Sequence, residues 1–91
     1  MGISYDADKN TRNIRERDLS FELVSEFDWA SAYIVEDIRR DYAEHRFQAL
    51  GFIGRRLHML VFTPRGADVH VISLRKANAR EGGRYEKAAD R

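Results

Sequence analysis

Three apolar runs joined by two short turns occupy residues 46–74, which read RFQALGFIGRRLHMLVFTPRGADVHVISL. Residues 46–53 alternate in the manner of a strand, and residues 57–63 are apolar on both faces, as expected of a central strand. The two links between the runs contain glycine or proline, which are typical of hairpin turns. The pattern therefore predicts an antiparallel meander whose last strand covers residues 68–74.

Two helices are expected before this meander. Asp6 provides an N-cap for a helix over residues 7–17. Ser20 provides a second N-cap, and Leu19 and Val24 around it have the spacing of a hydrophobic staple. The residues that follow Ser20 are largely apolar, so we expect the second helix to pack on a sheet.

The remaining segments are shorter. Residues 32–36 are a plausible further strand, and the charged residues 37–44 are interpreted as a solvated loop. Residues 3–5 are either a short strand or a lead-in to the first helix. At the other end, residues 78–88 are predicted to form a helix that begins at Asn78.

The C-terminal helix contains a stabilising and a destabilising signal. Asn78 and Glu81 are spaced as the two members of a capping box. Gly82 and Gly83 follow at once, and each costs about 1 kcal/mol relative to alanine within a helix. Together the elements predict an α+β fold with two N-terminal helices, an antiparallel sheet of three to four strands and a C-terminal helix, in one domain over residues 1–91.

Composition excludes several classes of protein. The chain has 91 residues, of which 43% are hydrophobic and 34% charged, so one small domain with one core is expected. It has no cysteine, which excludes disulfides, thiolate metal sites and cysteine nucleophiles. Its apolar runs are shorter than the roughly 18 residues of a membrane span, and its start does not resemble a signal peptide. We therefore expect a cytoplasmic protein that does not contact a membrane.

The net charge of +1 conceals an uneven distribution. Residues 20–45 carry two arginines and seven acidic groups, whereas residues 46–91 carry ten basic and four acidic groups. Thirteen of the sixteen basic residues are arginine, whose planar guanidinium binds phosphate or carboxylate through two hydrogen bonds. Such asymmetry indicates a polyanion or a protein partner, although charge alone is also explained by a solvated basic surface.

Arginines stand at the ends of the predicted strands. Arg46 opens one strand, Arg65 lies in a turn, and Arg75 closes the last strand. From the margins of one sheet, their guanidinium groups could converge on a single ligand. Phosphodiester cleavage without a metal requires such cations, because negative charge develops on the phosphate oxygens as the 2′-hydroxyl of RNA attacks. Surface arginines are nevertheless common, so this pattern alone does not identify an enzyme.

Cleavage also requires groups that remove and supply a proton. The candidates by residue type are Lys9, His70, Glu81 and Tyr85. The three histidines lack the spacing of metal ligands, and hydrogen-bonded, partly buried histidines are the simpler interpretation of His58 and His70. The motifs of serine hydrolases, P-loops and dinucleotide-binding folds do not occur, so no metal site and no cofactor is predicted.

The order of several short motifs is more specific than any one of them. From the N-terminus they read YDADKNTRN, LSFELVSEF, EHRFQALG, LVFTPRG and VISLRKANAREGGRY. This order resembles the BrnT family of bacterial type II toxins, and the block from Ile72 to Ala77 is its most distinctive piece. The positions that match the family pattern are Asp6, Lys9, Asn13, Ser20, Phe21, Phe27, Glu44, Arg46, Gly51, Arg65, Ser73, Arg75, Ala77, Glu81 and Tyr85.

The resemblance implies a RelE-like fold and metal-independent ribonuclease activity that inhibits translation. It also implies a BrnA-type antitoxin that neutralises the toxin and carries a DNA-binding portion, so that the complex contacts operator DNA indirectly. We expect a hetero-oligomer with paired toxins, in which the antitoxin covers the arginine-rich half of the chain. Trp29 and Tyr33 are further contacts in this interpretation, or else core residues.

The resemblance and the arginine pattern together assign roles to individual residues. The predicted catalytic residues are Lys9, Arg46, Arg65, His70 and Arg75. The predicted RNA-binding residues are Arg17, Lys76, Glu81 and Tyr85.

One departure from the family pattern leaves alternatives open. The family usually has Lys-His-Gly where this chain has Glu16-Arg17-Asp18. Arg17 can hold a phosphate, but an arginine does not transfer protons at neutral pH. The first alternative is therefore a catalytically inactive module that still binds the antitoxin and regulates the operon. A second alternative is a free-standing protein that binds RNA or DNA without cleaving it.

Overall fold

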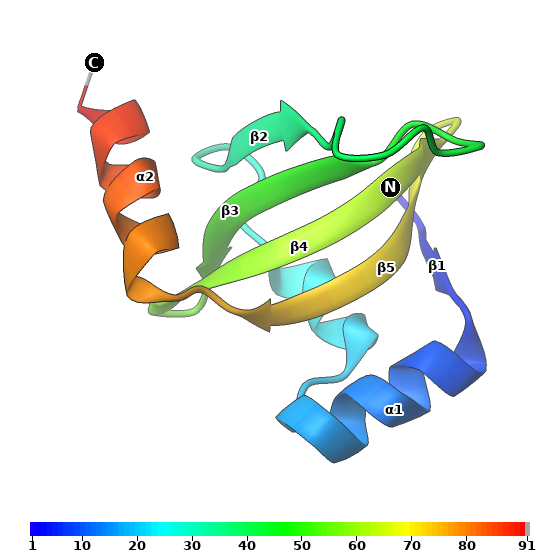
Figure 1. Cartoon of the computed structure of the whole chain (residues 1–91). Coiled ribbons are helices and arrows are strands. Elements are labelled where there is room, and N and C mark those ends of the chain that lie inside the picture. Colours follow the sequence, from blue (N-terminus) through cyan, green and yellow to red (C-terminus); the bar gives the residue numbers. More distant parts are fainter. Residues whose placement is uncertain (91) are drawn as a thin grey trace.

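The computed structural model describes residues 1–90, which form a five-stranded mixed sheet with the strand order β1-β5-β4-β3-β2 (Figure 1). Its three long strands are β3 (Phe47–Ile53), β4 (Arg56–Arg65) and β5 (Asp68–Lys76). Neighbours among them pair antiparallel, so the predicted meander is confirmed, with boundaries shifted by at most two residues.

A strand at each edge completes the sheet. At one edge β2 (Tyr33–Glu36) pairs antiparallel with β3. At the other edge β1 (Ile3–Tyr5) pairs parallel with β5, with Ile3 opposite Val69. The predicted antiparallel sheet of three to four strands is therefore only partly matched, because the sheet has five strands and one pair is parallel. The short strand considered for residues 3–5 is confirmed. A strand of three residues is too short for a periodic pattern, and its partner lies far along the chain, so local sequence does not reveal this pairing.

The first helix, α1 (Ala7–Arg17), has the predicted bounds. The carboxylate of Asp6 accepts hydrogen bonds from the backbone N–H groups of Asp8 and Lys9, at 2.9 and 3.1 Å. These bonds satisfy two of the amides that a helix leaves free at its start. The helix ends at Asp18, which has a left-handed backbone with a φ of 58°.

The second N-terminal helix is a 3₁₀ helix, η1 (Phe21–Glu26), where an amphipathic helix of unspecified type had been predicted. The buried side chains explain the tighter winding, because Phe21, Val24 and Phe27 recur at intervals of three residues. Three residues make one turn of a 3₁₀ helix, so all three side chains point to the same side. The N-cap prediction is confirmed, since the Ser20 hydroxyl accepts a hydrogen bond from the N–H of Glu22.

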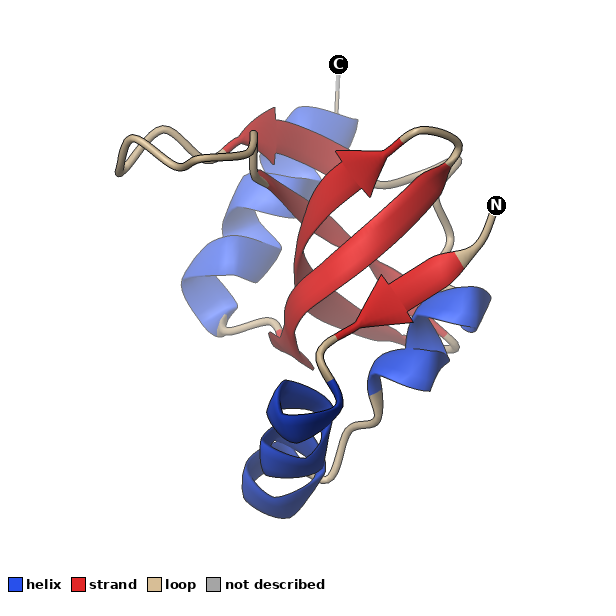
Figure 2. Ribbon diagram, turned by 90° about the vertical axis from the view of Figure 1, so that its right-hand side faces the viewer, coloured by secondary structure: helices blue, strands red, loops and turns tan. Residues whose placement is uncertain are grey.

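The C-terminal helix, α2 (Ala79–Ala89), confirms the prediction. Its capping box is complete: the N–H of Glu81 donates to Asn78 Oδ1 at 2.8 Å, and the N–H of Asn78 donates to Glu81 Oε1 at 3.0 Å. In Figure 2, α1 lies closer to the viewer than most of the sheet, and α2 lies farther away, behind the strands. No helix among residues 1–90 is long and apolar enough to cross a membrane.

The main core lies between the sheet and the N-terminal segments. Fully buried side chains of the three long strands, such as Ala49 and Leu60, pack there in one cluster with Phe21 of η1. Trp29 packs edge-on against Phe27 and Phe62, with ring centroids 4.8 and 5.2 Å apart. Of the two roles considered for Trp29, the structure therefore supports the core.

The opposite face of the sheet, which we call the outer face, is only partly covered. Side chains alternate along a strand, so Leu50 and Phe52 of β3 point away from the main core. Leu50 is buried, and the Phe52 ring meets the Tyr85 ring of α2 edge-on at 5.5 Å. Thus α2 covers one end of the outer face and leaves the rest open.

A β-bulge changes the alternation in β5. Val61 lies opposite Ser73 and Phe62 lies opposite Val71, so Ile72 is an extra residue without a partner. Val71 and Leu74 are both fully buried in the main core although they are three residues apart. The two residues between them, Ile72 and Ser73, therefore both lie on the outer face.

A buried amide joins α1 to β5. Asn13 Nδ2 donates hydrogen bonds to the carbonyl oxygens of Leu19 and Leu74, both at 2.9 Å, and Asn13 Oδ1 accepts a bond from Arg17 at 2.7 Å. The Asn13 side chain thus satisfies two buried carbonyl groups on different segments.

Replacing Asn13 with alanine is expected to lower the free energy of unfolding by about 2 kcal/mol, because the buried carbonyls of Leu19 and Leu74 lose their donor. Urea denaturation of the purified protein measures the change. Thr11→Ala, on the exposed side of the same helix, is the control and should change stability by less than about 0.5 kcal/mol. Equal stability of the two variants would contradict the structural role of Asn13.

Replacing a glycine with alanine is expected to raise the stability of the protein at Gly83 of α2 and to lower it at Gly51 of β3. A Cβ atom added at Gly83 meets no atom within 4 Å, so Gly83→Ala should stabilise the helix by up to about 1 kcal/mol. A Cβ added at Gly51 collides with the Phe27 ring, so Gly51→Ala should lower the melting temperature. Thermal unfolding followed by circular dichroism compares the two. A Gly83→Ala variant that melts earlier than the wild type would show that the glycine is required.

Candidate active site

A hollow on the outer face brings together four of the five predicted catalytic residues. They come from α1, from the segment before β3, from the end of β4 and from β5. We call this the central hollow; its lining residues are Lys9, Tyr42, Ala43, Glu44, Arg46, Thr63, Arg65, His70 and Ile72.

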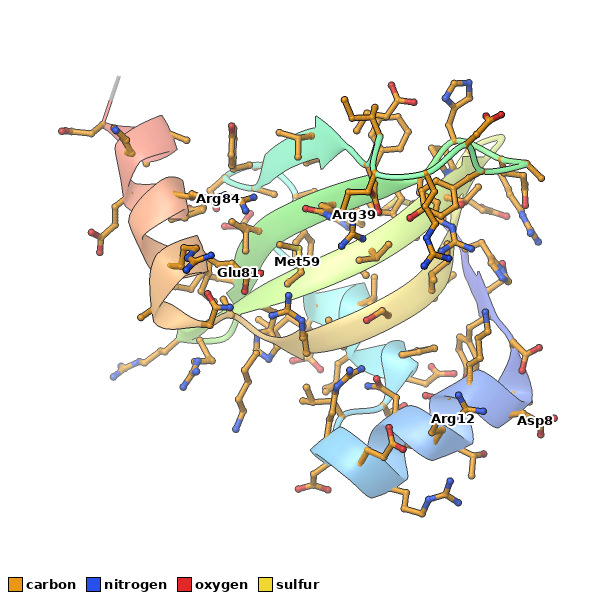
Figure 3. All side chains as sticks on the ribbon, viewed as in Figure 1. Asp8, Arg12, Arg39, Met59, Glu81 and Arg84 are labelled. Atoms are coloured by element: carbon orange, nitrogen blue, oxygen red, sulfur yellow. The ribbon has the colours of Figure 1, made fainter. Side chains whose placement is uncertain are left out.

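The fifth predicted catalytic residue, Arg75, lies in an adjoining hollow beside α2. Figure 3 shows four of its residues, Arg39, Met59, Glu81 and Arg84, above the outer face. We call this the α2 hollow; its lining residues are Arg39, Arg46, Gln48, Met59, Val61, Ile72, Ser73, Arg75, Glu81 and Arg84. Arg46 and Ile72 line both hollows, which therefore adjoin each other.

The bulge in β5 is the reason that His70 and Arg75 share a face. They are five positions apart in the sequence, and strict alternation would place them on opposite faces of the sheet. The extra residue Ile72 shifts the alternation by one position, so the side chains of His70 and Arg75 both lie on the outer face. There His70 lies opposite Thr63, and Arg75 lies opposite Met59. β-Bulges frequently reorient side chains next to active sites in this way.

Arg75 is held in place by a carboxylate. Its two terminal nitrogens donate to the two oxygens of Glu81, at 2.8 and 2.7 Å. Glu81 is 7% exposed, and the hydrogen bonds from Arg75 keep the pKa of its carboxyl below the usual value. The ionised Glu81 also accepts a bond from the N–H of Asn78, so it serves to position Arg75 rather than to transfer a proton.

Arg65 is paired less tightly. Its guanidinium donates to both oxygens of Glu44, at 2.9 and 3.2 Å, and lowers the pKa of that carboxyl. The two side chains are 48% and 52% exposed, and ion pairs at such positions are worth about 1 kcal/mol or less. A phosphate group entering the central hollow can therefore compete with Glu44 for Arg65.

Arg46 forms no ion pair with a carboxylate among residues 1–90. Its guanidinium lies 4.3 Å from the centre of the Tyr42 ring, in a cation–π contact. The loop that carries Tyr42 is held by Asp37, whose buried carboxylate accepts two bonds from Arg39, at 2.8 and 2.7 Å, and one from the Tyr42 hydroxyl. The Asp37 N–H also donates to the carbonyl of Arg46. Arg46 thus reaches the hollow with its positive charge available.

His70 supplies a neutral imidazole. Partial burial lowers its pKa below the ordinary value, and the nearby positive charge of Arg65 lowers it further. Its Nδ1 lies 2.9 Å from the hydroxyl oxygen of Ser4 on β1, which leaves Nε2 for contacts in the hollow. A neutral imidazole fixed at one nitrogen can accept a proton at the other.

The other two histidines lie elsewhere. His58 is buried, with Nδ1 2.8 Å from the carbonyl oxygen of Arg56, as the simpler interpretation expected. It lies opposite Lys76, whereas His70 lies opposite Thr63, so the two histidines stand at different ends of the hairpin. Within residues 1–90, no three His, Asp or Glu side chains are grouped as metal ligands would be.

The predicted RNA-binding residues are dispersed. Glu81 lines the α2 hollow, and Arg17 lines a further hollow along α1. Lys76 is exposed at the end of β5, outside the central and α2 hollows. The Tyr85 hydroxyl donates to the carbonyl of Ser31, which ties α2 to the segment before β2.

Sequence reasoning missed part of this surface. The loop of residues 37–44 was interpreted as solvated, yet it supplies Arg39 and Tyr42 to the two hollows. The loop has no periodic pattern, and only the alternation of acidic with basic and aromatic residues distinguishes it. Arg84 was also missed, although it follows Glu81 by three residues and so shares its face of α2.

The arrangement can bind a phosphodiester and stabilise the charge that develops on it. Arg46, Arg65 and Arg75 place fixed positive charges along one continuous surface, and His70 places a proton acceptor among them. Fixed cations stabilise the negative charge that develops on phosphate oxygens during cleavage.

Comparison with known proteins agrees with this chemistry. No curated protein matches the chain. A family model described as the ribonuclease toxin, BrnT, of type II toxin–antitoxin systems matches residues 5–81. The match includes all five predicted catalytic residues and most of the chain. This chain therefore belongs to the BrnT family of type II toxin–antitoxin ribonuclease toxins.

Proposed function

We propose that this protein cleaves RNA without a metal ion and thereby inhibits translation, with the central hollow as the catalytic site. The observation that carries the proposal is the convergence of Lys9, Arg46, Arg65 and His70 on one hollow. The charges of Lys9, Arg46 and Arg65 supply the stabilisation that a divalent cation supplies in metal-dependent nucleases.

The proposed reaction begins with proton removal by His70. When Nδ1–H donates to Ser4 Oγ, the lone pair of Nε2 faces the substrate and takes the proton of the ribose 2′-hydroxyl. The 2′-oxygen attacks phosphorus, the bond to the 5′-oxygen breaks, and a 2′,3′-cyclic phosphate and a 5′-hydroxyl are formed. In this proposal Lys9, which lines the same hollow, protonates the departing 5′-oxygen.

The arginines contribute electrostatic stabilisation. Arg46 and Arg65 hold the non-bridging oxygens of the scissile phosphate, and Arg65 exchanges Glu44 for the substrate. Arg75, fixed by Glu81, binds the neighbouring nucleotide in the α2 hollow. For Lys76 and Tyr85, contact with RNA remains a prediction from the sequence.

We further infer the partners from the family. A type II toxin has an antitoxin partner, and we propose that it is of the BrnA type and covers the central and α2 hollows. In this proposal paired toxins join one cytoplasmic complex, which reaches operator DNA only through the antitoxin. The basic charge of residues 46–91 supports docking of an acidic segment on this side of the protein.

A second candidate function is an inactive module that binds the antitoxin without cleaving RNA. It is favoured by Arg17, which stands where the family usually has histidine and is bound to Asn13 Oδ1. An arginine in that position holds an anion but transfers no proton. The two candidates differ in whether the purified toxin cleaves RNA.

Expression of the wild-type toxin without an antitoxin is expected to arrest growth and degrade RNA. Arg46→Ala should lower the rate of RNA cleavage by about 100-fold or more, because the scissile phosphate loses a fixed cation. Gel analysis of RNA incubated with purified protein measures the rate. Arg55→Ala, in the exposed turn between β3 and β4, removes the same charge elsewhere and should keep the activity. If wild type and Arg46→Ala leave RNA equally intact, the inactive module is the correct function.

The pH dependence of cleavage tests the role of His70. Only the neutral imidazole accepts a proton, so kcat/KM should fall as the pH drops through the pKa of His70, which lies below the ordinary 6.5. Arg65→Gln removes a charge that lowers this pKa, and so should move the acidic limb to higher pH. His70→Gln should abolish the limb together with most of the activity. An acidic limb that persists unchanged in His70→Gln would assign the base to another residue.

A further inference from the structure

We propose that a third hollow, along α1, binds a second phosphate of single-stranded RNA, next to the phosphate held in the central hollow. The inference rests on the proposed function and extends its site from one nucleotide step to at least two. We call this the α1 hollow; its charged lining residues are Lys9, Arg12, Glu16 and Arg17.

The α1 hollow adjoins the candidate active site. Lys9 and Ile72 line both the α1 hollow and the central hollow. Ile72 also lines the α2 hollow, so the bulge residue of β5 stands where all three meet. An RNA strand bound at the central hollow can therefore pass over Ile72 to reach α1.

The cations of the α1 hollow share one side of the helix. Lys9, Arg12 and Glu16 are spaced by three and four residues, so they project from α1 in the same direction, and Arg17 follows within a turn. Three cations and one carboxylate leave a net positive charge, which attracts an anion.

Arg17 is pre-positioned by a buried side chain. Asn13 is 4% exposed, and its Nδ2 is fixed by the carbonyls of Leu19 and Leu74. Its Oδ1 accepts a hydrogen bond of 2.7 Å from one terminal nitrogen of Arg17. This single bond orients the guanidinium and leaves its other N–H groups for a phosphate, so that less conformational entropy is lost on binding.

Single-stranded RNA fits this path better than an acidic peptide. The cations continue a surface whose centre holds the proton acceptor His70, and an RNA backbone presents phosphates at regular intervals along such a track. The half-buried Ile72 between two cationic hollows offers an apolar contact for a ribose or base.

Binding of short RNA tests the inference. The probe is a fluorescent 2′-O-methyl RNA hexanucleotide of mixed sequence, which lacks the attacking hydroxyl and stays intact. Arg12→Gln and Arg17→Gln should each weaken its binding about tenfold, the effect of losing a charged hydrogen bond. Each should also reduce the slope of log affinity against log salt by about 0.7, the value for one phosphate contact on a single strand. For a dinucleotide, which has a single phosphate, the same two substitutions should weaken binding several times less than they do for the hexanucleotide.

Two variants on the same helix provide matched controls. Arg15→Gln removes an equal charge from α1 outside the hollow and should change hexanucleotide affinity less than twofold. Glu16→Gln removes the negative charge of the hollow and should tighten binding. Anisotropy titrations at several salt concentrations measure all four variants.

Several results would overturn the proposal. Equal losses in Arg15→Gln and Arg17→Gln would show only a general effect of charge. Weaker antitoxin binding by Arg17→Gln with unchanged RNA affinity would make the α1 hollow a protein contact instead. Failure of the proposed function is distinguishable, because wild-type protein would then leave cleavable RNA intact while hexanucleotide affinity still depended on Arg12 and Arg17.

Discussion

The extra residue Ile72 in β5 is the feature on which the candidate site depends. It keeps Val71 and Leu74 in the main core and moves the intervening side chains outward. Because of this shift, His70 and Arg75 reach the same face of the sheet despite their odd spacing. The core side chains Val71 and Leu74 hold the bulge in place. Without the extra residue between them, one of these two buried side chains would point away from the core toward solvent.

Opposite charges prepare the surface for an anion without making the protein strongly basic. Arg39, Arg65 and Arg75 each have a carboxylate partner, whereas Arg46 is oriented by the Tyr42 ring. Arg46 and Arg75 are therefore held in position before an anion binds, whereas Arg65 must leave Glu44. The net charge of +1 limits non-specific attraction to nucleic acid, which suits a ribonuclease toxin restrained by a partner protein.

Local signals in the sequence predicted local structure well. The caps at Asp6, Ser20 and Asn78 are each formed by the expected side chain. The three long strands and their turns were also predicted, because neighbouring strands in a meander are neighbours in the sequence. The parallel pairing of Ile3 with Val69 and the 3₁₀ winding of η1 were not, since each depends on contacts with distant residues.

By itself, the sequence determined the α+β class, the helix starts, the meander and the family, because these follow from periodicity, capping and motif order. It also identified the cations and the histidine of the candidate site by residue type. Only the tertiary structure decided which of them meet. The bulge at Ile72, the loop held by Asp37 and the bonds of Asn13 set these positions, and each balances contacts between segments far apart in the chain.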